Sequence, residues 1–343
     1  MRAAVLDDGL RIMSWPEPEA GPGEALIAPM KVGICGSDVH FVLDGTAQPR
    51  FRPIVLGHEA MGVVVAVAAG TDGPPPGSRV SLIPLVSCYN CDQCRRGRTV
   101  LCRSSECLGA ERNGAWAELI SVPVRNLVPV PEGVSDELAA VATDSVATAY
   151  HAVARRGGVG PGSRVAVWGT GGLGLSAVGI AKTLGATAVI AVDPRPQARE
   201  WALATGADQA VPPGDALEAI SDLGGVDTAL EFVGRPDTLE LAVRSLDAGG
   251  VAVAVGIGSG NVQARKLMTF VVRERAVVGS YGNEPEEVRE VLDLLSSGRL
   301  VLPHVVGDVI PLANVNAGLA RVAAGDTGGS RILLDIQNEA EAE

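Results

Sequence analysis

Aromatic residues and long hydrophobic runs are scarce in this sequence. Phe, Trp and Tyr make up only 3 % of its 343 residues, while 47 % are hydrophobic, so aliphatic side chains must do most of the packing. No apolar run reaches the roughly 20 residues of a membrane-spanning helix. The opening residues, MRAAVLDD, resemble neither a signal peptide nor a transit peptide. We therefore expect a cytoplasmic protein that has no membrane partner.

Positive charge is also in short supply. The chain has 28 Lys and Arg against 40 Asp and Glu, which gives a formal net charge of −12 and an isoelectric point near 4.9. Nucleic acids are polyanions and are repelled by an acidic surface. The composition thus argues against nucleic acid as a partner and is compatible with a small neutral substrate.

The chain has two regions with different sequence patterns. Residues 1 to about 140 are rich in Gly and Pro and hold short β-like runs such as MGVVVAVAA (61–69), separated by turn clusters such as GTDGPPPGS (70–78). This pattern predicts an irregular β-rich domain. From about 162 to 282, strand-like runs such as RVAVWG (164–169) alternate with helical stretches. That alternation predicts a doubly wound parallel sheet and an α/β fold.

Four of the six cysteines stand within fifteen residues, in CYNCDQCRRGRTVLC. Four thiolates at this spacing can complete a tetrahedral shell around one zinc ion. Disulfides are the alternative, but closely spaced cysteines in a reducing compartment are more often metal ligands. The sequence therefore favours a structural zinc site made of Cys88, Cys91, Cys94 and Cys102.

The run GTGGLG follows a strand-like segment and opens a helical one, which is the context that a G-x-G-x-x-G turn needs. Gly169 permits a tight turn, Gly171 lets the backbone approach a pyrophosphate, and Gly174 lets the helix pack close to the strand. The helix N-terminus then offers unpaired N–H groups to the phosphates. The predicted dinucleotide site comprises Gly169, Gly171, Gly172, Leu173 and Gly174.

Asp193 ends the next strand-like run, nineteen residues after Gly174. A carboxylate at this place accepts the two adenosine ribose hydroxyls and repels a 2′-phosphate, so NAD is favoured over NADP. Arg195 argues in the other direction, because a guanidinium two residues on can pair with that phosphate. Asp193 can also be an ordinary turn residue before Pro194.

A second set of metal-ligand residue types is dispersed along the chain, in GICGSDVH (33–40), GHE (57–59) and ATDS (142–145). A thiolate, an imidazole and a carboxylate are a set that zinc accepts. Three protein ligands leave a fourth position for water or substrate, which marks a catalytic site. Spacing alone does not join residues that are more than a hundred positions apart.

These pieces, GICGSDVH, GHE, the four cysteines, GTGGLG and Asp193, resemble in type and order those of the zinc-dependent medium-chain alcohol dehydrogenases, over nearly the full length of the chain. The resemblance implies a GroES-like catalytic domain over 1–140 with a structural zinc lobe at 88–102, a Rossmann NAD-binding domain over 141–282, and a return to the catalytic domain over 283–343. It also implies a homodimer or homotetramer with its active site between the domains.

Carried over residue by residue, the resemblance makes Cys35 and His58 ligands of a catalytic zinc and places Asp144 at the third ligand position. Many members of the family have Cys there, so Asp144 matches the members that use a carboxylate. Glu59 corresponds to a glutamate implicated in ligand exchange at the metal. Asp38 is expected to orient the zinc-bound imidazole.

The implied reaction transfers a hydride between an alcohol, or its aldehyde or ketone, and NAD. Zinc would act as a Lewis acid on the substrate oxygen. The resemblance routes the released proton through Ser37 and the nicotinamide ribose to His40; the alternatives are an ordinary turn hydroxyl for Ser37 and a solvated surface residue for His40. It also implies that Thr148 contacts the nicotinamide and that Arg331 pairs with the cofactor pyrophosphate.

Two other functions fit parts of the pattern. One is a zinc-free reductase of the same superfamily that acts on activated alkenes, and the other is a dinucleotide-binding protein without catalysis. The presence of Cys35, His58, Asp144 and Ser37 argues against the second, since loss of function should first erase the ligands. We expect two zinc ions per chain; the identity of the alcohol is left open.

Overall fold

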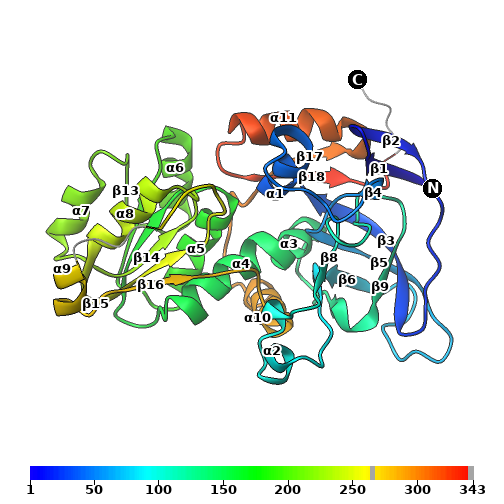
Figure 1. Cartoon of the computed structure of the whole chain (residues 1–343), viewed down its shortest axis with the longest axis horizontal. Coiled ribbons are helices and arrows are strands. Elements are labelled where there is room, and N and C mark those ends of the chain that lie inside the picture. Colours follow the sequence, from blue (N-terminus) through cyan, green and yellow to red (C-terminus); the bar gives the residue numbers. More distant parts are fainter. Residues whose placement is uncertain (263–266, 339–343) are drawn as a thin grey trace.

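A computed structural model describes residues 1–262 and 267–338 and shows two parts joined side by side (Figure 1). The part in green and yellow contains a parallel sheet, and the part in blue, cyan and red contains mainly antiparallel strands. The predicted α/β fold with a β-rich domain beside a doubly wound sheet is confirmed. Among the described residues, no helix is long and apolar enough to cross a membrane. Residues 339–343 of the predicted last segment lie outside the described residues.

The parallel sheet has six strands in the order β13-β12-β11-β14-β15-β16. Every neighbouring pair in it is parallel. Its strands are β11 (Arg164–Trp168), β12 (Ala188–Val192), β13 (Gln209–Val211), β14 (Val226–Glu231), β15 (Leu246–Ala254) and β16 (Ala276–Gly279). Its helices are α5 (Gly172–Thr183), α6 (Pro196–Ala204), α7 (Ala216–Asp222), α8 (Pro236–Ser245) and α9 (Leu267–Val272).

Strand β11 shows why these runs are apolar throughout. Val165 and Val167 belong to the hydrophobic cluster that contains the buried face of α5. Ala166 and Trp168 belong to another cluster, which contains buried residues of α7 and α8. Successive side chains of a strand point to opposite faces, so a sheet covered on both faces needs apolar residues at every position.

The other part is built on a seven-stranded sheet in the order β10-β6-β5-β3-β18-β17, with β9 also paired to β3. Strand β18, near the end of the chain, lies antiparallel to β3, so distant segments share one sheet. The strands are β3 (Glu24–Gly33), β5 (Ala60–Val67), β6 (Arg79–Leu82), β9 (Ile120–Pro123), β10 (Leu127–Pro129), β17 (Val306–Pro311) and β18 (Arg331–Asp335).

Smaller elements surround this sheet. A second sheet contains β1 (Arg2–Leu6), β2 (Leu10–Ser14) and β4 (Ile54–Val55), and a hairpin pairs β7 (Leu85–Val86) with β8 (Glu106–Cys107). The short helices are α1 (Gly36–Val39), η1 (His40–Asp44), α2 (Asp92–Arg95), η2 (Thr99–Leu101), η3 (Val124–Asn126) and η6 (Leu312–Asn314). Helix α11 (Val315–Ala324) lies near α1 and β18.

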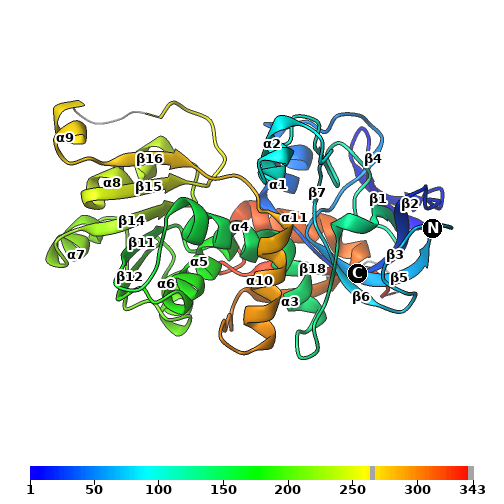
Figure 2. The same ribbon diagram turned by 90° about the horizontal axis from the view of Figure 1, so that it is seen from below.

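A helical run over residues 136–156, here called the connecting helix, extends from the β-rich part toward the parallel sheet (Figure 1). Ser135 caps its first turn, because the Ser135 hydroxyl accepts a hydrogen bond from the N–H of Leu138 at 3.3 Å. Helix α10 (Pro285–Ser296) packs against it, between the two parts (Figure 2). The connecting helix consists of the segments α3 (Asp136–Val141), η4 (Ala142–Val146), α4 (Ala147–Tyr150) and η5 (His151–Arg156).

Candidate active site

The four closely spaced cysteines form a compact cluster, here called the cysteine lobe with its segment 88–102. Four of their Sγ–Sγ distances are 3.4, 3.6, 4.0 and 4.0 Å. A tetrahedral zinc site with Zn–S bonds of about 2.3 Å requires sulfurs about 3.8 Å apart. All four are free thiols rather than disulfides, so the cluster fits one zinc ion bound by Cys88, Cys91, Cys94 and Cys102.

Backbone N–H groups around this cluster favour the thiolate form of Cys88 and Cys91, whereas burial raises the pKa of the Cys94 thiol to about 12. The N–H groups of Asn90 and Cys91 donate to the Sγ of Cys88 at 3.4 and 3.3 Å. Hydrogen bonds from the backbone of Cys94 and Arg103 lower the pKa of Cys91 to about 6. Because thiolates are the metal-binding form of cysteine, these donors prepare the lobe for a cation.

Cys35, His58 and Asp144, here called the mixed ligand set, come together although they lie far apart in the sequence. Cys35 precedes α1, His58 precedes β5, and Asp144 lies in the connecting helix. One ligand atom from each lies within 4.8 Å of the other two, and His58 Nε2 is 3.7 Å from Asp144 Oδ2. A thiolate and a carboxylate balance the charge of Zn²⁺, and three ligands leave one position open.

The surroundings of His58 determine which ring nitrogen faces a metal. Its Nδ1 lies 3.7 Å from Oδ1 of Asp38, a buried atom that has no hydrogen-bond partner. The other oxygen of Asp38 accepts a hydrogen bond from the N–H of Cys35 at 2.8 Å. Burial opposes protonation of His58, but the carboxylates of Asp38 and Asp144 hold the pKa of this imidazole well above its usual value. Nε2 is therefore the nitrogen available to zinc.

Arg331 balances the negative charge of this buried region. Its Nη2 lies 3.4 Å from the Sγ of Cys35 and 3.1 Å from Oδ2 of Asp144, and its Nε lies 3.1 Å from Oε2 of Glu59. Burial opposes ionisation of Asp144, but His58 and Arg331 together lower the pKa of its carboxyl. The aliphatic stem of Arg331 lies against Gly172, where a Cβ would be 3.2 Å from its Cδ. Its predicted contact with a pyrophosphate stays a prediction.

Ser37 and His40, the two residues predicted to relay a proton, lie at different depths. The hydroxyl of Ser37 is 3.5 Å from Nε2 of His58, the nitrogen that faces the ligand set. His40 is half-exposed, and its Nδ1 is 2.7 Å from Oδ2 of Asp44 and 2.9 Å from the hydroxyl of Thr46. Both residues line the same cavity, with Ser37 beside the ligands and His40 nearer to solvent.

The GTGGLG turn has the geometry that its glycines require. Gly169 has a φ of +87°, a conformation that favours glycine. Gly171 precedes the first turn of α5. A Cβ on Gly174 would lie 1.9 Å from the carbonyl oxygen of Gly169, so no larger residue fits there. The turn thus brings the N-terminus of α5 to the carboxyl end of β11.

Asp193 and Arg195 form an ion pair rather than two independent groups. Nε and Nη2 of Arg195 donate to the carboxylate of Asp193 at 2.9 and 3.0 Å, and the N–H of Thr170 donates at 2.9 Å. Burial opposes ionisation of Asp193, but Arg195 lowers the pKa of its carboxyl. The carboxylate is only 2 % exposed and holds the guanidinium beside the glycine turn.

One cavity of about 980 Å³ joins the two sites. It is lined by the mixed ligand set at one end and by the glycine turn and Asp193 at the other. Between them lie largely apolar walls that include Phe41, Leu85 and Leu108. A dinucleotide in the turn and a substrate at the metal ligands would therefore share one cavity.

Sequence reasoning missed residues that the fold adds to this cavity. Asn283 is buried, and its Nδ2 donates to the carbonyl oxygen of Thr143 at 3.0 Å and to the Thr148 hydroxyl at 3.4 Å. Thr148 in turn donates to Oδ1 of Asp144 at 3.2 Å. Cys107 lines the cavity as well, and burial raises the pKa of its thiol to about 12. Asn283 follows β16, and this position after a strand is the signal that could have indicated it.

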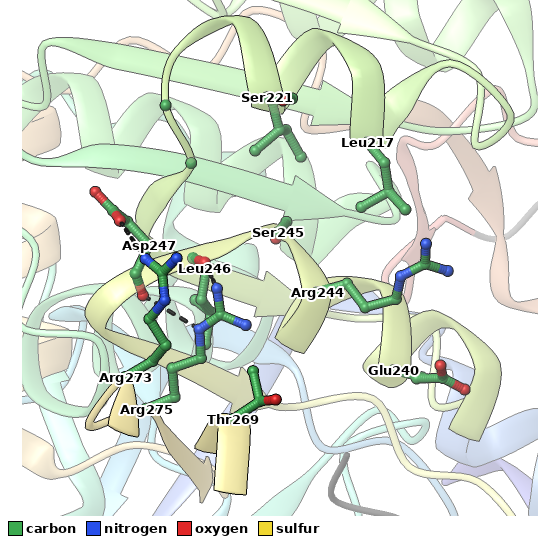
Figure 3. Close-up of a pocket in the computed structure, with 13 residues that line it drawn as sticks. Leu217, Ser221, Glu240, Arg244, Ser245, Leu246, Asp247, Thr269, Arg273 and Arg275 are labelled. Atoms are coloured by element: carbon green, nitrogen blue, oxygen red, sulfur yellow. Dashed lines mark hydrogen bonds and ion pairs between the residues drawn. The ribbon is translucent and has the colours of Figure 1, made fainter. Parts of the chain in front are cut away.

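A second cavity of about 970 Å³ lies at the opposite end of the parallel sheet, near the beginnings of β14 and β15 (Figure 3). Two of the arginines that line it, Arg273 and Arg275, are engaged within the fold. Arg275 donates to the carbonyl oxygens of Val243 at 3.4 Å, of Leu246, and of Asp247 at 3.3 Å, and so closes the C-terminal end of α8. Arg273 lies 3.9 Å from the carboxylate of Asp247. These contacts stabilise the sheet end rather than prepare a catalytic site.

A three-residue metal set with an open position, facing a dinucleotide turn across one cavity, defines a metal-dependent dehydrogenase. Family models agree: residues 21–132 match the alcohol dehydrogenase GroES-like domain and residues 172–297 match the zinc-binding dehydrogenase domain. The chain belongs to the zinc-binding medium-chain dehydrogenase family. It is a zinc-dependent oxidoreductase that transfers a hydride between an alcohol, or its carbonyl product, and a nicotinamide dinucleotide.

Individual relatives are similar over almost the whole chain. L-threonine 3-dehydrogenase of Alteromonas mediterranea is 30 % identical over 97 % of this chain and 98 % of its own length. Sorbitol dehydrogenase of Bacillus subtilis is 32 % identical over 94 % and 93 %. Among solved structures, alcohol dehydrogenase TADH of Thermus sp. ATN1 is 31 % identical, with a TM-score of 0.90 over 98 % of this chain and 99 % of its own.

We predict that Asp144→Ala removes the metal of the mixed ligand set while the cysteine lobe keeps its own, because the two clusters share no residue. Metal analysis should fall from about two zinc ions per chain to about one, with loss of activity. Glu137→Ala, in the first turn of the connecting helix, is the control and should keep both ions. Full turnover by Asp144→Ala would show that Asp144 is not a ligand.

Proposed function

We propose that the chain oxidises a small uncharged alcohol or polyol with NAD, or reduces the matching carbonyl compound with NADH. The observation that carries this proposal is the opening of Cys35, His58 and Asp144 into the cavity that also holds the glycine turn. When bound, zinc supplies a Lewis acid that makes an alcohol more acidic, and the nicotinamide accepts the hydride. The protein supplies position, charge and a route for the proton.

The residues around the ligand set have separate roles in this proposal. Asp38 holds the His58 ring with Nε2 toward the metal. Ser37, beside that nitrogen, would take the proton of the substrate oxygen, and His40, which pairs with Asp44, would pass the proton to solvent. Glu59, whose Oε2 is buried without a hydrogen bond, acts in ligand exchange.

We propose NAD over NADP because Asp193 lies buried at the place expected for the ribose hydroxyls. Its ion pair with Arg195 keeps its carboxylate charged. A relative of 30 % identity from Sinorhizobium meliloti, with a TM-score of 0.89 over 97 % of this chain and 98 % of its own, was solved with NADP. In this chain two of the three side-chain nitrogens of Arg195, Nε and Nη2, are held by Asp193. Contacts of Thr148 with the nicotinamide and of Arg331 with the pyrophosphate belong to the same proposal.

The cavity walls support an uncharged, hydroxyl-bearing substrate. Glu111 and Tyr281 line the cavity together with the mixed ligand set. Oδ1 of Asn283 is a buried acceptor without a partner in the same lining. Acceptors and a carboxylate suit the hydroxyl groups of a substrate and disfavour an anionic one. Sorbitol dehydrogenase, among the relatives, acts on such a polyol by its name.

We also propose three segments and a homo-oligomer. The segments are a catalytic domain over 1–140 with the zinc lobe at 88–102, a cofactor domain over 141–282, and a return over 283–343, as the pairing of β18 with β3 supports. Helix α9 lies beside β16, the end strand of the parallel sheet (Figure 2). The exposed apolar side chains of α9 support an oligomer. Leu267, Met268 and Val272 are each 75 % exposed. A dimer or tetramer formed at this edge would bury them.

The reaction is tested by NADH formation at 340 nm over a panel of alcohols, with the metal content of the enzyme measured beforehand. We expect turnover of polyols or simple alcohols and the poorest turnover of carboxylate-bearing alcohols such as lactate. Removal of zinc by a chelator should abolish activity, and added zinc should restore it. A fully active metal-free enzyme, or reduction of an activated alkene only, would contradict the proposal.

We predict that Asp193→Ala weakens NAD binding by about tenfold, because two ribose hydroxyls lose their acceptor, a loss of about 1.4 kcal/mol. NADP should bind as well as before or better, since Arg195 is released. Titration with NADH and with NADPH, followed by nucleotide fluorescence, measures the two dissociation constants. Glu200→Ala on the neighbouring α6 is the control. An unchanged NAD/NADP ratio would show that Asp193 does not select the cofactor.

We predict that Met268→Glu reduces the oligomeric state of the protein, because it places a charge in the apolar surface of α9. Light scattering coupled to size exclusion would measure the mass. Leu203→Glu changes another exposed apolar residue, on α6, and should leave the mass unaltered. An unchanged mass for Met268→Glu would place the contact elsewhere.

A further inference from the structure

One short segment contacts both the cysteine lobe and the connecting helix. Residues 283–287 follow β16 and include the first turn of α10. We propose that Asn283 and Glu284 are positioning residues that brace Asp144 against the cysteine lobe, so that an ordered lobe tightens metal binding by the mixed ligand set. This inference rests on the proposed function of that set and adds a physical link between the two metal sites.

Glu284 makes the contact with the lobe. Its carboxylate accepts hydrogen bonds from the N–H of Thr99 at 2.9 Å, from the N–H of Val100 at 3.2 Å, and from the Thr99 hydroxyl. Thr99 and Val100 lie between Cys94 and Cys102, two of the lobe's cysteines. The direction of these donors therefore depends on the conformation that the lobe adopts around its metal.

Asn283 makes the contact with the ligand Asp144. Its Nδ2 donates to the carbonyl oxygen of Thr143, which can only accept, so the orientation of the amide is determined. The same Nδ2 donates to the hydroxyl of Thr148, and that hydroxyl donates to Oδ1 of Asp144. The residues on which Asn283 acts thus stand one position before Asp144 and one helical turn after it.

Glu287 fastens the same segment to the connecting helix a second time. Its Oε2 accepts the N–H of Glu284 at 2.7 Å. Its carboxylate, only 2 % exposed, also contacts Nδ1 of His151 at 2.9 Å and Nε of Arg155 at 3.3 Å. Because the segment is held on two sides, a shift of Glu284 is passed to the connecting helix rather than absorbed by a loop.

The consequence for metal binding follows from the two oxygens of Asp144. Oδ2 faces Nε2 of His58 at 3.7 Å, while Oδ1 is held by Thr148. Groups that orient a metal ligand typically change metal affinity by about 10- to 100-fold when they are lost. A lobe that has lost its order would free Glu284 and Asn283 to move, and Asp144 would be presented less well.

The test uses the full-length protein with zinc in the lobe and cobalt(II) at the mixed ligand set. The visible absorption of cobalt bound to the Cys35 thiolate reports that site alone, and competition with a chelator gives its dissociation constant. The decisive variant is Glu284→Asp. Aspartate caps helices well, so α10 keeps its cap, but its carboxylate is one methylene too short for the Thr99 and Val100 donors.

We expect Glu284→Asp to weaken cobalt binding about tenfold and to alter the cobalt spectrum, while the lobe keeps its zinc. Glu286→Gln is the matched control, because Glu286 lies in the same turn, is exposed, and pairs with Arg289 at 3.2 Å. It should match the wild type. Wild-type affinity and spectrum in Glu284→Asp would overturn the proposal, since a role limited to capping predicts that result.

Thr99→Val tests the link from the side of the lobe. It removes one donor to Glu284 without touching a cysteine or the mixed ligand set. We expect about threefold weaker cobalt binding, and no further loss when it is combined with Glu284→Asp, because interacting residues are not additive. Fully additive losses of cobalt affinity, or wild-type affinity in Thr99→Val, would overturn the link. The result for Thr99→Val alone still tests the link if Glu284→Asp does not fold. A wild type that binds no cobalt at Cys35 would instead refute the proposed metal site.

Discussion

The buried charge balance around Arg331 is the interaction on which the active site depends. Asp38, Glu59 and His58 are buried, Cys35 and Asp144 are partly exposed to the cavity, and a single guanidinium contacts three members of this group. Buried charges persist only when they are paired, and removal of one partner from such a pair costs about 3–5 kcal/mol. The ligand set is therefore assembled around a permanent cation and is ready for a divalent one.

The charged groups of this balance come from separate segments of the chain. Cys35 and His58 come from loops at the ends of sheet strands, Asp144 comes from the connecting helix, and Arg331 begins β18. Each segment has its own hydrophobic packing, which fixes its side chain without help from a metal. The cysteine lobe is different, since its cysteines lie within one irregular segment and rely on backbone N–H groups and a cation for their arrangement.

Local patterns allowed part of this molecule to be predicted from its sequence. The parallel sheet followed from the alternation of strand-like runs with helical stretches, and the glycine turn followed from GTGGLG after such a run. The positive φ of Gly169 and the close contact at Gly174 agree with that turn. The four cysteines were recognisable because their spacing is short. The joining of Cys35, His58 and Asp144 needed the family resemblance, because no local rule brings together residues from three segments.

Contacts across long sequence distances could not be predicted. Glu284 and Thr99 are separated by 185 positions and meet only because α10 packs beside the lobe. Asp193 and Arg195 were read as competing signals for two cofactors, whereas they are hydrogen-bonded to each other. Their proximity in the sequence was visible, but the direction of the guanidinium depends on the fold.

Arg331 has one more consequence, which concerns thermodynamics. Its stem lies on Gly172 of the dinucleotide turn and its head lies on Cys35 and Asp144. If the nucleotide and the metal both contact this side chain, as proposed, any coupling free energy between them acts equally in both directions. Whatever the nucleotide does to the affinity of the metal, the metal must do to the affinity of the nucleotide, so neither constant has a meaning without stating the occupancy of the other site.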